Sequence, residues 1–392
     1  MKRYSQPTVW LLAAAFLVAG GAIHAQQPSD ASPSVDVSET HFRDAPEFRA
    51  TFPGMGSRTD NWPEGAPIQE EGSVGYCQIC ADSECEADFF VGADYLFVRP
   101  HFSEAVAFAQ GTLGASSFDV VGRDLDFGYD SSLRAFAGYR FGNGDGELRF
   151  TFWHLSGETS ADAANPGAGQ FIVDPFGNVV GTAIVLDPNS ALFGTPIVGG
   201  EAIHTEARVD ANICDLDFAV PWVAHNPNWT FLTSIGIRVA DIDQFYESVI
   251  VDGAGDFFSG GDFSVDFIGV GPRVGLESRR YFGDNRRLSL FAKAHGALLV
   301  GDYDVRFSQT TTAPPFQASQ TSTAARTIPV TETELGATCR IGDSFNLSTG
   351  WLFQAWYDMG TSGGKFGGFF SGADDANIMS FDGLFVRGEF GF

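Results

Sequence analysis

Alternation of apolar and polar residues with a period of two is the dominant pattern of the chain from Asp88 to the C-terminus. In the clearest example, Ala202 to Leu216, the even positions are mainly polar or charged, whereas the odd positions are small and apolar. Successive side chains of a β-strand point to opposite faces, so this period gives each set a face of its own. The pattern recurs at 132–141, 147–152, 229–239, 287–298, 345–358 and 384–392. It predicts an all-β fold for residues 88–392.

The connections between these segments differ in length. Short polar turns are expected at 142–146, 225–228, 283–285 and 342–343, and long irregular segments near 101–128, 159–200, 252–261, 308–326 and 360–379. Short turns on one side and long loops on the other are typical of transmembrane β-barrels of the outer membrane. These connections join about ten antiparallel strands, or twelve if 102–111 and 118–129 form a hairpin of their own.

Composition narrows the class of protein further. The 392 residues are 14% aromatic, which excludes a disordered chain, and lack the repeated long apolar runs of a helical membrane protein. The formal charge of −26 repels phosphate backbones, so we expect no nucleic-acid partner.

The N-terminus carries the features of an export signal. Lys2 and Arg3 precede the apolar stretch from Val9 to Ile23, and Ala25 offers a small residue for cleavage. We expect a signal peptide at 1–25, with an uncleaved N-terminal anchor as the alternative. Pro, Ser, Gly and many acidic residues break up every apolar cluster in 26–87, which predicts a disordered, flexible acidic linker in the periplasm.

This linker contains a cluster of three cysteines, Cys77, Cys80 and Cys85. An oxidising compartment favours a disulfide between two of them, and the third could crosslink a neighbouring chain. A metal site would need a fourth ligand that is missing locally. We expect no metal and no cofactor.

The last strand ends on an aromatic residue. Leu384, Val386, Phe390 and Phe392 alternate with Phe385, Arg387 and Glu389, and an amphipathic last strand that ends in Phe is the signal by which the bacterial barrel-assembly machinery recognises its clients. Lipid of the outer membrane is the expected partner of the apolar face, which includes Trp351, Phe353, Tyr357, Phe390 and Phe392.

Four segments of the alternating region carry a family resemblance: Asp94–Phe102, Leu133–Phe141, Leu148–His154 and Gly269–Glu277. They resemble the Legionella major outer membrane protein family, and the resemblance spans roughly 88–392 without the acidic linker. It implies a pore-forming outer-membrane barrel, while its motifs are structural and do not specify a solute. Gly269–Gly275 also shifts the parity of the apolar positions, which we interpret as a β-bulge or glycine kink.

In a membrane barrel the polar set faces the lumen. We expect the cationic and histidine lining to comprise Arg134, Arg140, Arg149, His204, Arg208, Arg238, Arg287, Lys293, Arg340 and Arg387, and the acidic lining Asp94, Glu147, Glu206, Asp210, Asp266, Glu334, Asp358 and Glu389. A barrel of about ten strands has little free interior. The sequence therefore predicts a narrow, weakly selective or gated passage for small solutes or ions, and no enzyme.

Two other functions are compatible with the pattern. A structural envelope protein or adhesin would present its long loops and form homo-oligomers or disulfide-linked neighbours. A hydrolase on the barrel wall would use His154, His204, Glu206 and Asp210, but period-two spacing places such residues on one face without any catalytic role.

Overall fold

The computed structural model describes residues 88–103, 106–113, 118–142, 146–167, 169–184, 196–222, 226, 228–283, 285–312, 315–359 and 378–392. The signal peptide, the acidic linker and the cysteine cluster predicted within 1–87 lie outside these residues. No helix among the described residues is long and apolar enough to span a membrane.

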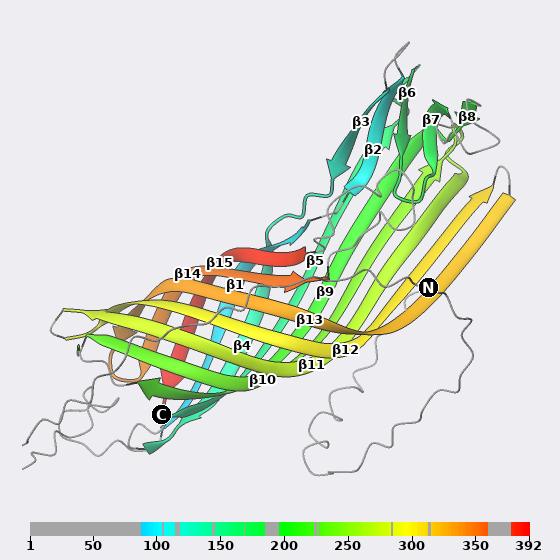
Figure 1. Ribbon diagram of the computed structural model, residues 1–392. Helices are drawn as coiled ribbons and strands as arrows, with labels where there is room; N and C mark the ends of the chain where they lie inside the picture. The colour runs from blue at the N-terminus through cyan, green and yellow to red at the C-terminus, as the bar shows by residue number, and fades with distance from the viewer. Residues whose placement is uncertain are drawn as a thin grey trace, which may run out of the picture. The chain divides into compact units, whose positions relative to one another are not determined.

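Ten of the described strands close into an antiparallel barrel (Figure 1). Around the wall they follow the order β1-β15-β14-β13-β12-β11-β10-β9-β5-β4, and β1 closes the ring by pairing with both β15 and β4. The strands are β1 Asp88–Phe102, β4 Asp130–Arg140, β5 Glu147–Ala164, β9 Ala202–Trp222, β10 Trp229–Val251, β11 Phe257–Phe282, β12 Leu288–Thr312, β13 Pro315–Ile341, β14 Phe345–Tyr357 and β15 Ile378–Gly391. The predicted all-β barrel of about ten strands is confirmed.

A second, five-stranded sheet has the order β3-β2-β6-β7-β8. Its strands are β2 Val106–Leu113, β3 Phe118–Asp124, β6 Gln170–Val173, β7 Val179–Ile184 and β8 Pro196–Val198. The hairpin considered for 102–111 and 118–129 therefore exists as β2 and β3, but it belongs to this sheet. The alternative of twelve wall strands is wrong.

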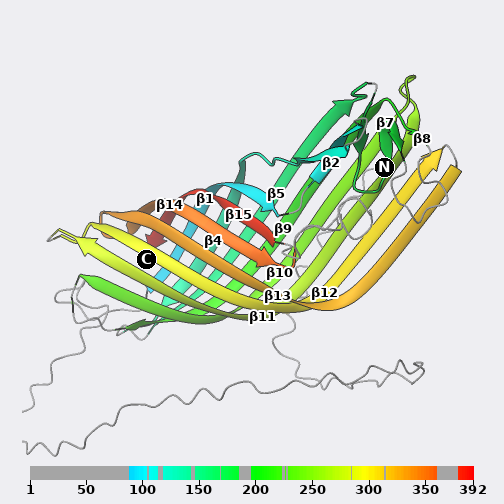
Figure 2. The same cartoon turned by 45° about the horizontal axis from the view of Figure 1, so that its top comes forward.

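The wall strands differ in length. Strands β9 to β13 have 21 to 27 residues, whereas β1, β4, β14 and β15 have 11 to 15, so one side of the wall runs on beyond the other (Figure 2). The long irregular segments predicted at 252–261 and 308–326 are wrong in part, because β11 begins at Phe257 and β12 and β13 continue to Thr312 and Pro315. Ser, Thr and Gln occupy both faces of the β12–β13 end, so no apolar period marks these strands in the sequence.

The polarity of the two faces inverts along the long strands. On β10 the outward side chains Ile235, Ile237 and Val239 are apolar and exposed, and beyond them the outward positions become Asp241 and Asp243. The same change occurs on β11 after Val270 and Ile268, and on β12 after Val300. A lipid-facing wall thus becomes a water-facing wall within single continuous strands.

This inversion explains the parity shift at Gly269–Gly275. Strand β11 keeps one continuous register with β10 from Ser259 to Arg280, and the irregularity in that pairing lies between Ile250 and Val251. The predicted bulge at the glycines is therefore wrong. The apolar set changes parity because the apolar face of β11 changes from the inner to the outer side of the wall.

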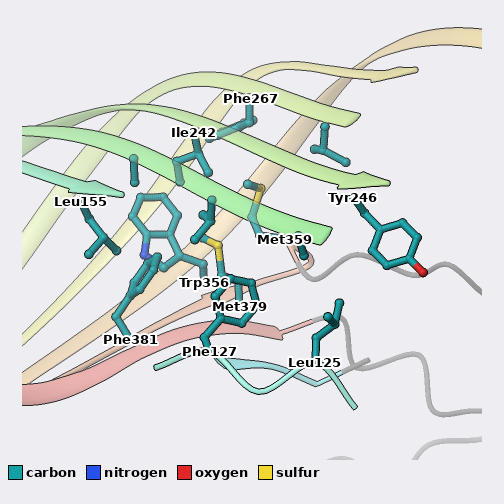
Figure 3. Close-up of a cluster of buried hydrophobic side chains, with 14 of the residues drawn as sticks. Leu125, Phe127, Leu155, Ile242, Tyr246, Phe267, Trp356, Met359, Met379 and Phe381 are labelled. Carbon is teal, nitrogen blue, oxygen red and sulfur yellow. The ribbon is translucent and has the colours of Figure 1, made fainter. Parts of the chain in front are cut away.

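The inner face inverts in the opposite sense. Towards the end that carries the long connections, here called the long-loop end, the interior is filled by an apolar layer (Figure 3). Its members are almost completely buried: Leu96, Val98, Trp153, Leu155, Ile242, Phe267, Trp356, Met359, Met379 and Phe381. Burial of large side chains at about 1.5–3 kcal/mol each makes this layer a core in its own right.

The second sheet packs against the inner face of the long strands. Phe176 lies between Tyr246 and Phe307, with ring centroids at 5.7 and 5.5 Å. The Tyr246 hydroxyl donates to the carbonyl of Ala107 at 2.8 Å, and Ser248 Oγ donates to Asp174 Oδ2 at 2.8 Å. Apolar packing and buried hydrogen bonds together hold the sheet over β10 and its neighbours.

Candidate functional site: a charged layer inside the barrel

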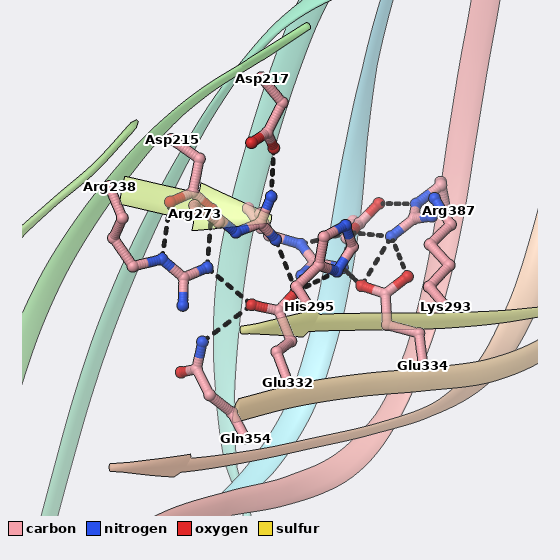
Figure 4. A network of polar contacts seen from close by, with 12 residues as sticks. Asp215, Asp217, Arg238, Arg273, Lys293, His295, Glu332, Glu334, Gln354 and Arg387 are labelled. Atoms are coloured by element: carbon pink, nitrogen blue, oxygen red, sulfur yellow. Dashed lines mark hydrogen bonds and ion pairs between the residues drawn. The ribbon is translucent and has the colours of Figure 1, made fainter. Parts of the chain in front are cut away.

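Below the apolar layer, the interior is crossed by ionisable side chains that point inward from the wall strands (Figure 4). We call this set the charged layer. It comprises Asp94, Arg134, Asp215, Asp217, Arg238, Arg273, Glu277, Lys293, Glu332, Glu334 and Arg387. Alternation positions each of them, because these residues share parity with the buried positions of their strands.

One half of the layer centres on Asp94 and Glu334. Arg387 donates to Asp94 from Nε at 2.7 Å and from Nη2 at 2.9 Å, and to Glu334 Oε2 at 3.0 Å. Arg134 donates from Nε to Asp94 Oδ2 at 2.6 Å and also to Glu334. Two arginines and two carboxylates from β1, β4, β13 and β15 therefore form one closed ion-pair group.

The other half centres on Glu332 of β13. Arg238 binds Asp215 in a bidentate manner, with both bonds at 2.7 Å, and donates to Glu332 Oε2 at 2.7 Å. Arg273 donates to Asp217 and, at 3.5 Å, to Glu332. Glu332 thus connects β9, β10 and β11 with its own side of the barrel.

A short polar path leads from the charged layer to the apolar layer. Gln354 Nε2 donates to Glu332 at 3.0 Å, and Trp356 Nε1 donates to Gln354 Oε1 at 3.0 Å. Both side chains are completely buried. The boundary between the two layers is therefore fixed by hydrogen bonds, which satisfy the polar groups that burial would otherwise penalise.

Towards the end with the short turns, here called the short-turn end, the pairs become less buried. Lys293 Nζ lies 3.0 Å from Glu277, Arg149 lies 2.8 Å from Glu147, and Arg140 lies 2.5 Å from Glu389. Charges of both signs thus line the interior down to this opening.

A cavity of about 70 Å³ lies within the charged layer. Four buried polar atoms in its walls have no hydrogen-bond partner among the described residues: Arg149 Nε, Asp217 Oδ1, Arg273 Nε and His295 Nδ1. A polar cavity of this size has room for water, which such groups require. The layer therefore has room for water but leaves no wide opening.

Several predicted lumen residues do lie in the interior. Arg134, Arg238, Lys293, Glu334 and Arg387 belong to the charged layer. Arg140 and Arg149 face inward nearer the short turns. Arg340 shares the inward parity of β13, and at the turn its side chain donates to the carbonyl of Asp343 at 3.0 Å.

The structure corrects the other predicted lumen residues. His204, Glu206, Arg208 and Asp210 lie on the outer face of β9, while Ile203, Thr205, Ala207 and Val209 are buried inside. Asp266 also faces outward, 3.2 Å from Arg306, and Asp358 follows the end of β14, 3.6 Å from Arg326. The prediction assumed that polar faces point inward throughout, whereas β9 extends past the apolar outer band.

The histidines considered for catalysis share this outer position. His204 Nδ1 lies 2.6 Å from Asp162 Oδ1, and His154 Nδ1 lies 2.9 Å from Asn212 Oδ1. No group of three or more ligand-type side chains in the described part of the chain could hold a metal ion.

Five members of the charged layer were missed from the sequence: Asp215, Asp217, Arg273, Glu277 and Glu332. Their signal is the parity switch itself. In β9 the odd positions change from apolar Ile213 to acidic Asp215, while the even positions change to apolar Leu216 and Phe218. If that switch is interpreted as the edge of the lipid-facing band, the acidic residues at odd positions, Asp215 and Asp217, are predicted to face the barrel interior.

The predicted lipid-facing aromatic residues lie on the outer surface. Trp351, Phe353 and Tyr357 occupy outward positions of β14, and Phe390 and Phe392 lie at the end of β15; all five are exposed. Such rings near the ends of an apolar band match the interfacial girdles of membrane barrels.

The family model described as "Legionella pneumophila major outer membrane protein precursor" matches residues 83–392. The chain belongs to this family. It is accordingly a protein of the outer membrane, as the apolar outer band requires. No curated protein matches the sequence.

Solved outer-membrane barrels share the fold only distantly. The outer membrane protease OmpT from Escherichia coli is 10% identical with a TM-score of 0.43, covering 80% of this chain and 100% of its own. The toluene transporter TodX from Pseudomonas putida is 8% identical with a TM-score of 0.33, covering 80% and 91%. The outer membrane channel DcaP of Acinetobacter baumannii is 11% identical with a TM-score of 0.16, covering 79% and 99%. At this similarity neither proteolysis nor transport carries over to this chain.

Proposed function

We propose that the protein is a narrow outer-membrane channel for small polar solutes or ions, with the charged layer as its constriction. The observation that carries the proposal is the concentration of paired charges inside the barrel at the level of the apolar outer band. Ionisable groups at membrane depth are costly, and in membrane proteins they mark ion or substrate pathways. A barrel that served only as a scaffold could fill this interior with apolar side chains at lower cost.

The pairing of these charges also supports a narrow passage. Arg134, Arg238 and Arg387 are each held by two or more carboxylates, so the constriction is crossed by side chains from both sides. Beyond it the apolar layer fills the interior. Passage therefore requires side chains of both layers to move, which favours small solutes and gated conduction over a wide general pore.

The proposal also includes the orientation of the barrel in the outer membrane and its route of insertion. Short turns face the periplasm in outer-membrane barrels, which places the start of β1 and the preceding acidic segment on the periplasmic side. The amphipathic last strand supports insertion by the barrel-assembly machinery. No reaction is assigned to the histidines, since those of the predicted catalytic set lie on the outer wall.

The proposal is tested by liposome swelling with solutes of graded size and charge. The double variant Lys293→Ala with Glu277→Ala removes the Lys293–Glu277 ion pair at the cavity, together with the contact of Glu277 to Arg279. We expect it to swell liposomes severalfold faster with the solutes that the wild type admits, while the unchanged apolar layer still limits solute size. Arg208→Ala with Asp210→Ala removes a matched pair, 3.3 Å apart, on the outer wall and should leave swelling unchanged. A heat-modifiable band on electrophoresis confirms that each variant is folded.

A structural or adhesive role is the second candidate, because the apolar layer fills the interior above the charges. The long strands, the second sheet and the hydroxyl-rich β12–β13 hairpin would then be the functional surface. Folded wild-type and double-variant barrels that both fail to admit any solute would favour this role over the channel.

A further inference from the structure

An arginine lies on the outer face of the wall at the short-turn end. Arg280 of β11 has the same outward parity as Val274 and Leu276, which are exposed apolar residues of the outer band. In the register it is directly opposite Trp229 of β10 and Leu290 of β12. Its guanidinium lies 5.5 Å from the centre of the Trp229 ring and 5.2 Å from that of Phe282. Arg280 therefore sits where the apolar band meets the aromatic girdle.

The charge of Arg280 is not neutralised by the described residues. Three other arginines occupy outward positions of wall strands, and each has a carboxylate within 4.0 Å: Arg99 with Asp126, Arg208 with Asp210 and Arg306 with Asp266. No ion pair of Arg280 is found in the described part of the chain. The following turn, 283–287, contains Arg286 and Arg287 together with Asp284 and so carries a net charge of +1, in a chain whose net charge is −26.

The environment defines what neutralises this charge. A guanidinium at a membrane interface, with its stem along apolar neighbours, places its charge at the level of the lipid headgroups. The five N–H donors of arginine match the oxygens of a phosphodiester, and aromatic rings next to it form the usual interfacial belt. Free phosphate would gain nothing from the apolar residues Leu276 and Leu290, whereas the acyl chains of a phospholipid would cover them.

The geometry points to a binding site for an anionic phospholipid, of the phosphatidylglycerol type, at Arg280 and Trp229. The phosphodiester accepts hydrogen bonds from Arg280, and the acyl chains follow the outer band. The site lies on the outside of the barrel, so it does not depend on whether the interior conducts.

Native mass spectrometry of the full chain in detergent, titrated with phosphatidylglycerol or phosphatidylcholine, tests this inference. We expect selective retention of phosphatidylglycerol by the wild type. Arg280→Gln should weaken that retention about tenfold, the loss expected for a hydrogen-bonded charge pair. The matched control is Arg208→Gln, an outward arginine outside the apolar band, which should retain the lipid as the wild type does.

Three results would overturn the site. The first is equal retention of the two lipids by the wild type, and the second is unchanged retention of phosphatidylglycerol by folded Arg280→Gln. The third is displacement of the lipid by inorganic phosphate at equal concentration, because that result would indicate a site for free anions. The wild-type comparison needs no variant and so stands even if Arg280→Gln fails to fold.

Discussion

Val239 of β10 and Val270 of β11 lie directly opposite each other on the outer face, in the last continuous apolar row of the wall. Val300 of β12 continues the row opposite Val270. Two rows further on, the outward positions are Asp243, Asp266 and Asp304, again directly opposite one another. The row of valines therefore marks the long-loop edge of the lipid-facing band.

The position of this edge predicts where an arginine is tolerated. Ile237→Arg places a charge inside the apolar band and should cost about 2–4 kcal/mol of folding free energy in lipid vesicles. Ser160→Arg places the same side chain beyond the edge, opposite Glu206, and should be close to neutral. Urea titrations of folding into vesicles measure both. Equal costs for the two substitutions would show that the edge is misplaced.

The charged layer predicts a strong asymmetry between inner and outer carboxylates. Glu332→Ala leaves Arg238 and Arg273 buried without one of their acceptors, and removing one member of a buried pair costs about 3–5 kcal/mol. Glu206→Ala on the outer wall should stay within about 0.5 kcal/mol. The same urea titrations compare them. A small effect of Glu332→Ala would mean that water already reaches its partners freely.

The contact of Phe176 predicts that the second sheet can be loosened separately from the barrel. Phe176→Ala removes the ring that packs on Tyr246 and Phe307, a loss of about 3–5 kcal/mol for a buried aromatic residue. We expect faster proteolysis within the strands of the second sheet, β2, β3, β6, β7 and β8, while the heat-modifiable barrel band persists. Val121→Ala, at an exposed position of β3, is the control and should change neither readout. Loss of the barrel band in Phe176→Ala would contradict separate packing.

Asp174 predicts a pH dependence of the β6–β7 turn. Burial raises the pKa of Asp174 to about 6 from its ordinary value of 3.8, although Oδ1 accepts from the amides of Phe176 and Asn178 and Oδ2 from Ser248. Because the pKa of Asp174 is higher in the folded than in the unfolded protein, protonation of Asp174 stabilises the fold. This contribution to the free energy of unfolding is complete below about pH 4 and is lost as the pH rises through 6, by about 3 kcal/mol at most.

Hydrogen exchange of β6 and β7, corrected for the intrinsic rate, measures this effect. Protection should be greater at pH 5 than at pH 7, and Asp174→Asn should remove the difference. Identical protection of the wild type at both pH values would contradict the burial of an ionisable carboxyl at this turn.

Much of the fold could be predicted from the sequence because the period of two is explicit. The alternation at 229–239 and at 384–392 predicts wall strands, and the number of connections between such segments predicts how many strands there are. What alternation leaves open is which face is the inner one. The polar face of β9 is outside at Arg208 and inside at Asp215, since lipid surrounds only part of the strand.

The site was predictable in part for the same reason. Arg134, Lys293 and Arg387 lie in strand segments within the apolar band, where the polar face is the inner one. Glu332 and Arg273 belong to the site because of their ion-pair partners on other strands. Those contacts depend on the pairing register of the strands, which cannot be predicted from a single sequence. The β12–β13 hairpin escaped prediction because neither of its faces is apolar.

Single-channel recording in planar lipid bilayers tests the central claim most directly. A barrel whose interior is crossed by paired charges and an apolar layer should show small, fluctuating conductance steps, and Lys293→Ala with Glu277→Ala should enlarge them while Arg208→Ala with Asp210→Ala should not. Steady wild-type steps in the nanosiemens range, as from an open aqueous pore, would contradict the account.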